Sequence, residues 1–163
     1  MTELSRPFAL DRIGAAGAEV VVEAGPDELA PLGRRLMIPA VNRLLCRFRL
    51  RRAGDAVIAA TGTLEAEVVR ECVLTLDEFP QEMREDFTVE FVPSGSETDD
   101  PDPESPDQIP YEGGAIDLGE AAVEQLALAL DPYPKKPGAE ESPLGEEEQP
   151  GPFAGLAALR PKQ

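Results

Sequence analysis

The chain has 163 residues, enough for one domain, and its formal net charge at pH 7 is −17. It contains no histidine, which excludes Ser–His and Cys–His nucleophile pairs and histidine metal ligands. It has no apolar run long enough to predict a membrane span, and its N-terminus lacks the pattern of a secretory signal. With only two cysteines, a disulfide framework is not expected, and we expect a cytoplasmic protein.

The excess negative charge lies in one half of the sequence. Residues 1–76 carry ten basic and ten acidic side chains, whereas residues 77–163 carry five basic and 22 acidic ones. An acidic protein of this kind is repelled by nucleic acid at long range, so any contact with RNA needs a local basic patch.

In the first half of the chain, apolar and polar residues alternate as they do in β-strands. Residues 18–24 have strand composition, and residues 26–36 predict a short helix that Pro31 and Gly33 limit. Residues 42–52 predict a strand with an apolar face and an arginine face, followed by a turn at 53–55 into the next strand. The apolar face of residues 42–52 consists of Leu44, Cys46, Phe48 and Leu50.

Apolar residues continue at even positions from Ile58 to Leu76, and only Arg70 interrupts them. One straight strand of that length would be unusual, so we expect a bend or bulge near Arg70. Cys72 shares the apolar parity and is interpreted as a buried structural thiol, since its neighbours of both charge signs offer no strong thiolate stabilisation. Residues 77–83 are expected to connect to a strand over 86–92.

The rest of the chain contains one clear helix and two polar segments. Residues 93–108 are rich in Pro, Ser and acids and predict a flexible acidic loop. Residues 117–130 predict a helix that Asp117 and Glu120 begin as a capping box, a structural role. Residues 134–163 are expected to be mostly disordered, with one short apolar segment at 153–159.

These patterns predict one α+β domain over residues 1–133. An antiparallel, barrel-like sheet should pack with the long C-terminal helix and the short N-terminal one.

Three stretches together resemble a known family. They are TGTLEAEVVRECVLTLDEF, DFTVEFVP and YEGGAIDLGEAAVEQLALALDPYPKKPGA, and they are similar to the YceD family of large ribosomal RNA subunit accumulation proteins. LSRPFALDRI and PFAGLAAL resemble the alphaproteobacterial branch. The resemblance implies a non-enzymatic ribosome biogenesis factor that supports accumulation of the large-subunit (23S) ribosomal RNA. Many relatives carry a second cysteine three residues after the first, where this chain has Thr75, so no metal site or cofactor is expected.

Seven arginines lie between Arg34 and Arg52 without an intervening acid. On a strand, alternate arginines form an evenly spaced cationic row, and guanidinium groups bind phosphate oxygens irrespective of base sequence. Alternatively, the row pairs with Glu65, Glu67 and Glu71 of a neighbouring strand, attracts the acidic loop, or forms a solvated edge. The residues predicted to contact RNA or the ribosome are Arg43, Arg47, Arg49, Arg51 and Arg52.

Two kinds of partner follow from these features. The arginine row favours large-subunit ribosomal RNA or a pre-ribosomal particle. The acidic half, if it is more than a solubilising surface, favours a basic large-subunit ribosomal protein that it shields before assembly. We expect no small-molecule substrate and no membrane partner.

Overall fold

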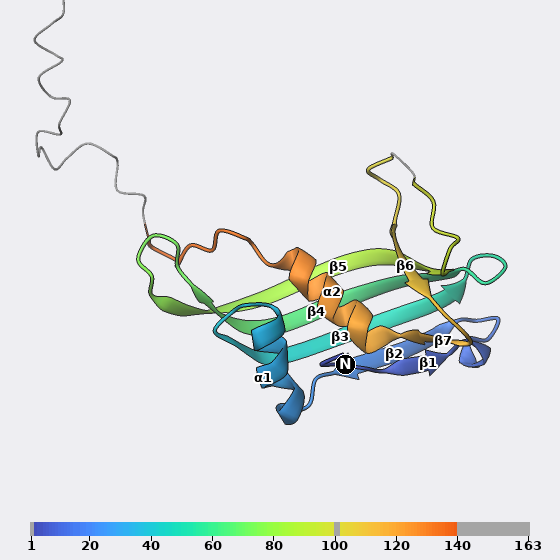
Figure 1. Cartoon of the computed structure of the whole chain (residues 1–163), viewed down its shortest axis with the longest axis horizontal. Coiled ribbons are helices and arrows are strands. Elements are labelled where there is room, and N and C mark those ends of the chain that lie inside the picture. Colours follow the sequence, from blue (N-terminus) through green and yellow to red (C-terminus); the bar gives the residue numbers. More distant parts are fainter. Residues whose placement is uncertain (1, 100–101, 140–163) are drawn as a thin grey trace, which may run out of the picture.

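The computed structural model describes residues 2–99 and 102–139. Its centre is a five-stranded sheet in the order β2-β3-β4-β5-β6, in which only the β5–β6 pair is parallel (Figure 1). A two-stranded antiparallel ribbon, β1–β7, lies beside it. The strands are β1 Pro7–Ala9, β2 Ala18–Glu23, β3 Ala40–Arg52, β4 Ile58–Glu71, β5 Glu78–Pro93, β6 Asp107–Tyr111 and β7 Ala115–Asp117.

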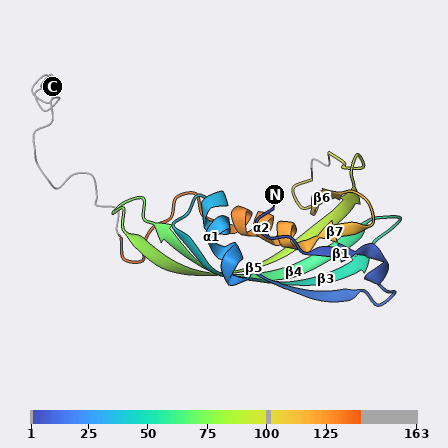
Figure 2. The ribbon, with the colours of Figure 1, turned by 60° about the horizontal axis from the view of Figure 1, so that its bottom comes forward.

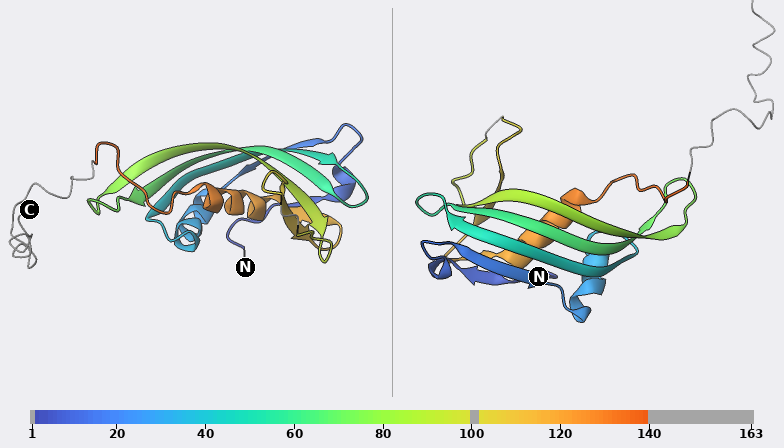
Figure 3. Two further views of the ribbon diagram at one scale, coloured as in Figure 1. Left: turned by 90° about the horizontal axis from the view of Figure 1, so that it is seen from above. Right: turned by 180° about the vertical axis from the view of Figure 1, so that it is seen from behind.

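The helices lie on one side of the sheet only. Helices α1 (Pro26–Arg35) and α2 (Leu118–Ala129) pack under the arch of the sheet, as Figure 2 and the left view of Figure 3 show. A 3-10 turn, η1 (Leu10–Arg12), follows β1. The right view of Figure 3 shows the opposite side of the sheet, which no helix covers. We call these two sides the covered face and the open face.

Alternation along the central strands explains the core. Even-numbered residues of β4, and of β3 from Leu44 onward, point to the covered face, where they meet the apolar side of α2. The buried residues there include Leu44, Cys46, Phe48 and Leu50 of β3, Ile58, Ala60, Leu64, Ala66 and Val68 of β4, and Leu118, Ala122 and Leu126 of α2.

Gly62 of β4 accommodates an aromatic ring on the covered face. A Cβ at Gly62 would lie 2.3 Å from the Phe87 ring, so only glycine leaves room for that ring. Phe87 in turn meets Phe48 edge-to-face, with ring centroids 5.6 Å apart. At this point the side chains of β3 and β5 pack against each other across Gly62 of β4.

The predicted α+β class and its two helices are confirmed, but the barrel-like closure is wrong. The sheet is open, with β2 and β6 as its two edges. The covered face is filled by α1, α2 and the β1–β7 ribbon, so the strands need not close on themselves to bury their apolar side chains. Helix α1 lies within the predicted residues 26–36, and it continues through Pro31 and Gly33, which were expected to limit it.

The region around Arg70 differs from the prediction. Strand β4 pairs regularly with β5 as far as Glu71, and the register shift lies in β3, between Val41 and Arg43. Arg70 is only 6% exposed, and its Nη2 donates to the carbonyl oxygen of Asp131 at 2.6 Å, just beyond α2. An arginine therefore occupies the covered face, where it anchors the segment that follows the helix, and no bulge interrupts the pairing of β4 with β5 at this point.

Strand β5 is longer than predicted. Residues 78–85 were expected to belong mostly to a connection, but they pair with β4 from Glu78 onward. Strand β6 begins at Asp107, inside the expected loop of residues 93–108. The expected disordered tail, including residues 153–159, lies outside the described residues from position 140 onward.

Candidate nucleic-acid interface on the open face of the sheet

The open face is built from residues that stand directly opposite one another on neighbouring strands. Such residues share a face of the sheet, so the register defines its rows. Two rows run Glu19–Arg49–Thr61–Thr88 and Val21–Arg47–Thr63–Asp86. The open face comprises Glu19, Val21 and Glu23 of β2, Arg43, Leu45, Arg47, Arg49 and Arg51 of β3, Thr61, Thr63, Glu65 and Glu67 of β4, and Glu82, Arg84, Asp86 and Thr88 of β5.

Strand β3 places four of the five predicted arginines on the open face. Arg43, Arg47, Arg49 and Arg51 are exposed there, with successive alternate residues about 6.6–6.8 Å apart along the strand. We call Arg47, Arg49 and Arg51 the arginine row; the residues between them, Phe48 and Leu50, point to the covered face. The row is thus positioned by a rigid strand rather than by a loop.

Carboxylates on the neighbouring strands contact several of these arginines. Glu65 lies within 4.0 Å of Arg43 Nη2 and 3.5 Å of Arg47 Nη1. Glu19 Oε1 lies 3.2 Å from Arg49 Nε. These pairs are exposed, and exposed ion pairs contribute about 0–1 kcal/mol each, so a stronger anionic partner could replace them.

The remaining two predicted arginines, Arg51 and Arg52, differ in their contacts. Arg51 makes no hydrogen bond or ion pair with any other residue in the described ranges 2–99 and 102–139. Arg52 instead turns toward the N-terminal segment, where its Nη2 donates to the carbonyl oxygen of Leu10 at 2.6 Å and its Nε to that of Ile13 at 3.2 Å. The structure therefore gives Arg52 a role in holding the 3-10 turn, apart from the row.

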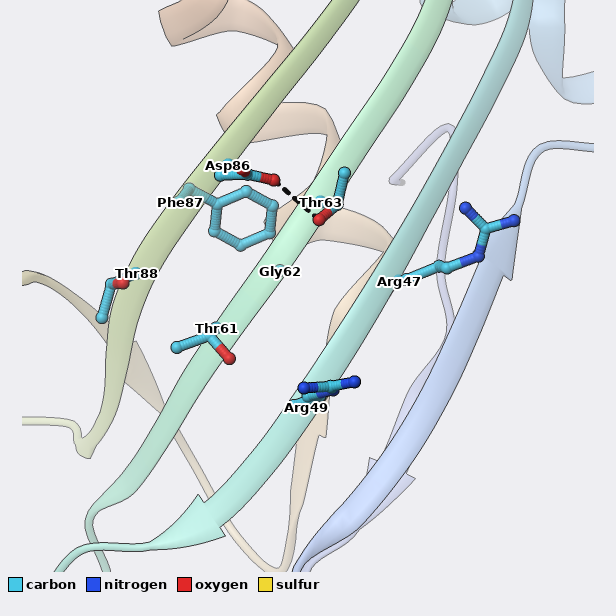
Figure 4. A pocket seen from close by; sticks show the side chains of 8 residues that line it. All are labelled: Arg47, Arg49, Thr61, Gly62, Thr63, Asp86, Phe87 and Thr88. Atoms are coloured by element: carbon cyan, nitrogen blue, oxygen red, sulfur yellow. Dashed lines mark hydrogen bonds between the residues drawn. The ribbon is translucent and has the colours of Figure 1, made fainter.

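A hollow of about 500 Å³ lies between the long arginines and β5 (Figure 4). It exists because short side chains, Thr61, Thr63 and Thr88, stand beside Arg47 and Arg49 in the same rows. Thr63 Oγ1 donates to Asp86 Oδ1 at 2.7 Å. Guanidinium and hydroxyl groups around a hollow can bind the phosphate and sugar oxygens of RNA, and such contacts fix position without reading sequence.

Sequence reasoning missed the threonines of this hollow as site residues. Their odd-numbered positions on β4 were visible, but only the register shows that Thr61 and Thr63 lie opposite Arg49 and Arg47. It also missed Arg84 of β5, whose Nη1 lies 3.4 Å from Glu65 Oε1. Glu71, which was considered as a partner of the row, lies at the far end of β4, opposite Glu78.

Cys72 lies in the turn after β4, outside the strand in which it was predicted. It is buried and not in a disulfide, and its Sγ accepts a hydrogen bond from the backbone N–H of Lys136 at 3.3 Å. This hydrogen bond, together with weaker ones from Thr75 and Leu74, lowers the pKa of the Cys72 thiol to about 7 and outweighs the effect of burial. The largest part of this thiolate stabilisation therefore comes from a residue 64 positions away, and the rest from the turn that follows Cys72.

Asp117 caps α2, but Glu120 does not complete a capping box. Asp117 accepts hydrogen bonds from the backbone N–H groups of Gly119 and Glu120 and also from Ser5 and Arg6 of the N-terminal segment. Glu120 instead forms a salt bridge with Arg35 at the end of α1. These two carboxylates join the N-terminal segment, α1 and α2.

Membrane-spanning helices and metal sites are both absent from the described residues. Neither helix among them is long and apolar enough to cross a bilayer. No group of three or more His, Cys, Asp and Glu side chains in residues 2–99 and 102–139 is arranged to hold a metal ion.

Comparison with known proteins gives one match. A family model described as "Large ribosomal RNA subunit accumulation protein YceD" matches residues 60–160, which include β4, β5 and α2. No curated protein and no solved structure matches the chain. Because the match covers more than half of the chain, the protein belongs to the YceD family.

Proposed function

We propose that this protein is a non-enzymatic ribosome biogenesis factor that contacts large-subunit ribosomal RNA, or a pre-ribosomal particle, through the arginine row. The family name implies a role in the accumulation of that RNA. The observation that carries the proposal is the open face, where Arg47 and Arg49 border a hollow lined by threonine hydroxyl groups and Asp86, and Arg51 continues the row beside it. The protein is expected to act in the cytoplasm, where ribosomes are assembled, without a small-molecule substrate.

The contact is with the phosphate backbone rather than with bases. The open face as defined above carries no aromatic side chain, because Phe48, Phe87 and Phe91 all point to the covered face. Stacking platforms that bind unpaired bases need aromatic rings. Arginine and threonine contacts to phosphate and sugar would follow the shape of the RNA instead.

The carboxylates Glu19 and Glu65 compete with RNA for the row. They hold Arg49 and Arg47 in the free protein, and RNA phosphates would have to displace them. This competition suggests a direct test. Replacing both acids with glutamine removes the competitors and keeps the arginines.

The experiment measures binding of purified protein to large-subunit precursor RNA over a series of salt concentrations. The variant Glu19→Gln/Glu65→Gln should bind more tightly than wild type, and Arg47→Gln/Arg49→Gln/Arg51→Gln should bind more weakly. If the row neutralises three phosphates, the slope of log K against log salt should fall by about 2–3 in the triple variant. Equal binding by all three proteins would exclude the arginine row as the contact.

A second candidate function is supported by the same face. The open face holds at least as many carboxylates as guanidinium groups, and basic ribosomal proteins bind acidic surfaces. The partner would then be a basic large-subunit ribosomal protein. A pull-down treated with RNase separates the two: an RNA-bridged association is lost, whereas a direct protein complex survives. In that case the Glu19→Gln/Glu65→Gln variant should weaken the complex.

A further inference from the structure

Strand β6 fills only part of the outer edge of β5. It pairs with residues 89–93, at one end of that long strand (Figure 1). Strand β5 pairs with β4 from Glu78 onward, so beside residues 82–88 it is the last strand of the sheet. We call residues 82–88 the free edge. A free edge presents unpaired backbone N–H and C=O groups, which are a template for pairing with another chain.

The register shows which backbone groups of the free edge point outward. The N–H of Cys72 donates to the carbonyl oxygen of Asp77 at 2.8 Å, so these opposite residues form a hydrogen-bonded pair. Because such pairs alternate along an antiparallel ladder, odd-numbered residues of β5 bond to β4 and even-numbered ones turn their N–H and C=O outward. On the free edge these include Glu82, Arg84 and Asp86, whose outward groups have no partner among residues 2–99 and 102–139.

Residues on either side of the free edge agree with this parity. Pro80 has no N–H, and an even-numbered position on the outer side needs none. At the other end of β5, the N–H of Ser94 points to the side of β6 and donates to the carbonyl oxygen of Tyr111 at 2.9 Å. The outward groups of the free edge therefore follow from the register of the whole strand.

The free edge, the start of β6 and the end of α2 border one hollow of about 300 Å³. Its lining includes Phe87 of β5, Asp107 of β6 and Leu128 of α2. Phe87 is only partly buried and Leu128 is 69% exposed, so apolar surface lies on the covered-face side of the free edge. A strand added to β5 in line with β6 would find space there, and apolar contacts for the side chains of one of its faces.

The charges along the free edge favour a basic partner over a second copy of the chain. Glu82, Glu85 and Asp86 are exposed on it, and Asp107 begins β6. In an antiparallel pair of two free edges centred on Arg84, that arginine would face its own copy and Glu82 would face Asp86. Like charges directly opposite each other destabilise a sheet, and they protect an exposed edge from self-association. The same carboxylates attract a strand that carries lysine or arginine.

We propose that the free edge of β5 binds an extended basic segment of a partner protein as an added strand. The backbone of Glu82, Arg84 and Asp86 supplies the hydrogen bonds. Basic side chains of the segment lie on the open face beside the carboxylates, and apolar ones lie over Phe87 and Leu128 on the covered face. The inference rests on the second candidate function for the class of partner, and it is independent of RNA binding by the arginine row.

The test adds a short peptide that alternates lysine and valine to the full-length protein at low salt, and follows amide hydrogen exchange by NMR. In the free protein the outward amides of Glu82, Arg84 and Asp86 should exchange fast, whereas those of Met83 and Glu85, which bond to β4, should exchange slowly. At about 90% saturation the peptide should slow the three outward amides about tenfold. A peptide that alternates glutamate and valine should not. Equal effects of the two peptides, or no slowing by either, would overturn the inference.

The variant Arg84→Pro separates strand addition from simple attraction of charge. It removes an outward N–H, but it also removes the basic side chain from the free edge. Strand addition predicts about tenfold weaker binding of the lysine–valine peptide, whereas the matched control Arg84→Gln keeps the N–H and should bind at least as tightly as wild type. Pro80 already occupies an outward position of the same strand, so the fold should tolerate the change. Tighter binding by both variants would show attraction of charge alone and overturn the inference.

Two further measurements need no substitution in β5. Methylating one alternate set of backbone nitrogens in the peptide should abolish binding, and methylating the other set should leave it, because only one side of a strand pairs with β5. Equal effects would contradict strand addition. Outward amides that are already protected in the free protein, and lose that protection on dilution, would indicate a second copy on the edge and overturn the inference.

The same titration distinguishes this inference from the contacts proposed for the open face. The triple arginine variant should bind the peptide at least as tightly as wild type, so a failure of RNA binding leaves the inference intact. Peptide-induced shifts confined to Glu19 and Glu65 would place the basic partner on the open face. That result would support the second candidate function and overturn strand addition at the free edge.

Discussion

The two faces of the central sheet come from the same strands but follow different rules. On β3, Phe48 is buried against the helices, while its neighbours Arg47 and Arg49 are solvated. The covered face must be apolar and close-packed, because most of the folding free energy comes from its burial. The open face makes only weak, exposed ion pairs and can change sequence at little cost to the fold. Alternate residues of one strand therefore serve different purposes: those on the covered face stabilise the fold, and those on the open face are available for binding.

The largest expected effect is on the covered face. Phe48→Ala removes a buried ring that contacts Phe87 edge-to-face, and it should destabilise the protein by about 3–5 kcal/mol. Urea unfolding measures the change, with Arg47→Ala on the same strand as the matched control. The control should lie within about 0.5 kcal/mol of wild type. Similar losses of unfolding free energy for Phe48→Ala and Arg47→Ala would contradict the different roles of the two faces.

A smaller effect is expected at the junction that closes the covered face. Asp117→Ala removes the cap of α2 and its hydrogen bonds to Ser5 and Arg6, and it should cost about 2 kcal/mol. The control Asp27→Ala in the first turn of α1 lacks a side-chain cap contact and should cost less.

The contribution of Asp117 should depend on pH in a defined direction. Burial raises the pKa of this carboxyl, but hydrogen bonds from Ser5, Arg6 and the first turn of α2 outweigh it, so the pKa lies below its ordinary value. The stabilisation is therefore present above about pH 4 and is lost as the pH falls through the lowered pKa. Acid unfolding curves of wild type and Asp117→Ala should converge below that pH. Curves that stay parallel would contradict the assignment.

The two cysteines differ in the pKa of their thiols, because one lies on the covered face and the other in the turn after β4. Burial raises the pKa of Cys46 on the covered face to about 12, whereas hydrogen bonds, first from Lys136 and then from Thr75 and Leu74, lower the pKa of Cys72 to about 7. At pH 8, a thiol reagent should modify Cys72 first, after local opening of the segment over it, and leave Cys46 unmodified. Mass spectrometry of digested protein measures both sites. Faster labelling of Cys46 would contradict this ranking.

The sequence predicts the faces of the sheet better than its closure. The alternation of Leu44, Cys46, Phe48 and Leu50 with arginines determines both sides of β3, because a strand has a period of two. The same parity suggested that Leu74 and Leu76 point inward, but they lie in a turn and are exposed. Period alone cannot show where a strand ends.

The candidate site could be predicted only in part. Arg47, Arg49 and Arg51 were visible as a row on one strand. Their carboxylate partners and the threonine-lined hollow depend on which residues of β2, β4 and β5 stand opposite them, and this register is fixed by turns and core packing over the whole sheet. The role of Arg52 in holding Leu10 and Ile13 depends on a long-range contact that no local pattern reveals.

The most direct test of the central claim is complementation by the arginine-row variant. Arg47→Gln/Arg49→Gln/Arg51→Gln should keep the wild-type Tm to within a few degrees, because the row makes only exposed pairs. Large-subunit ribosomal RNA is then measured in a strain that lacks the protein and expresses the variant. We predict a folded variant that fails to restore this RNA. A folded variant that restores it fully would contradict the account, and a variant that unfolds would show that the row is structural.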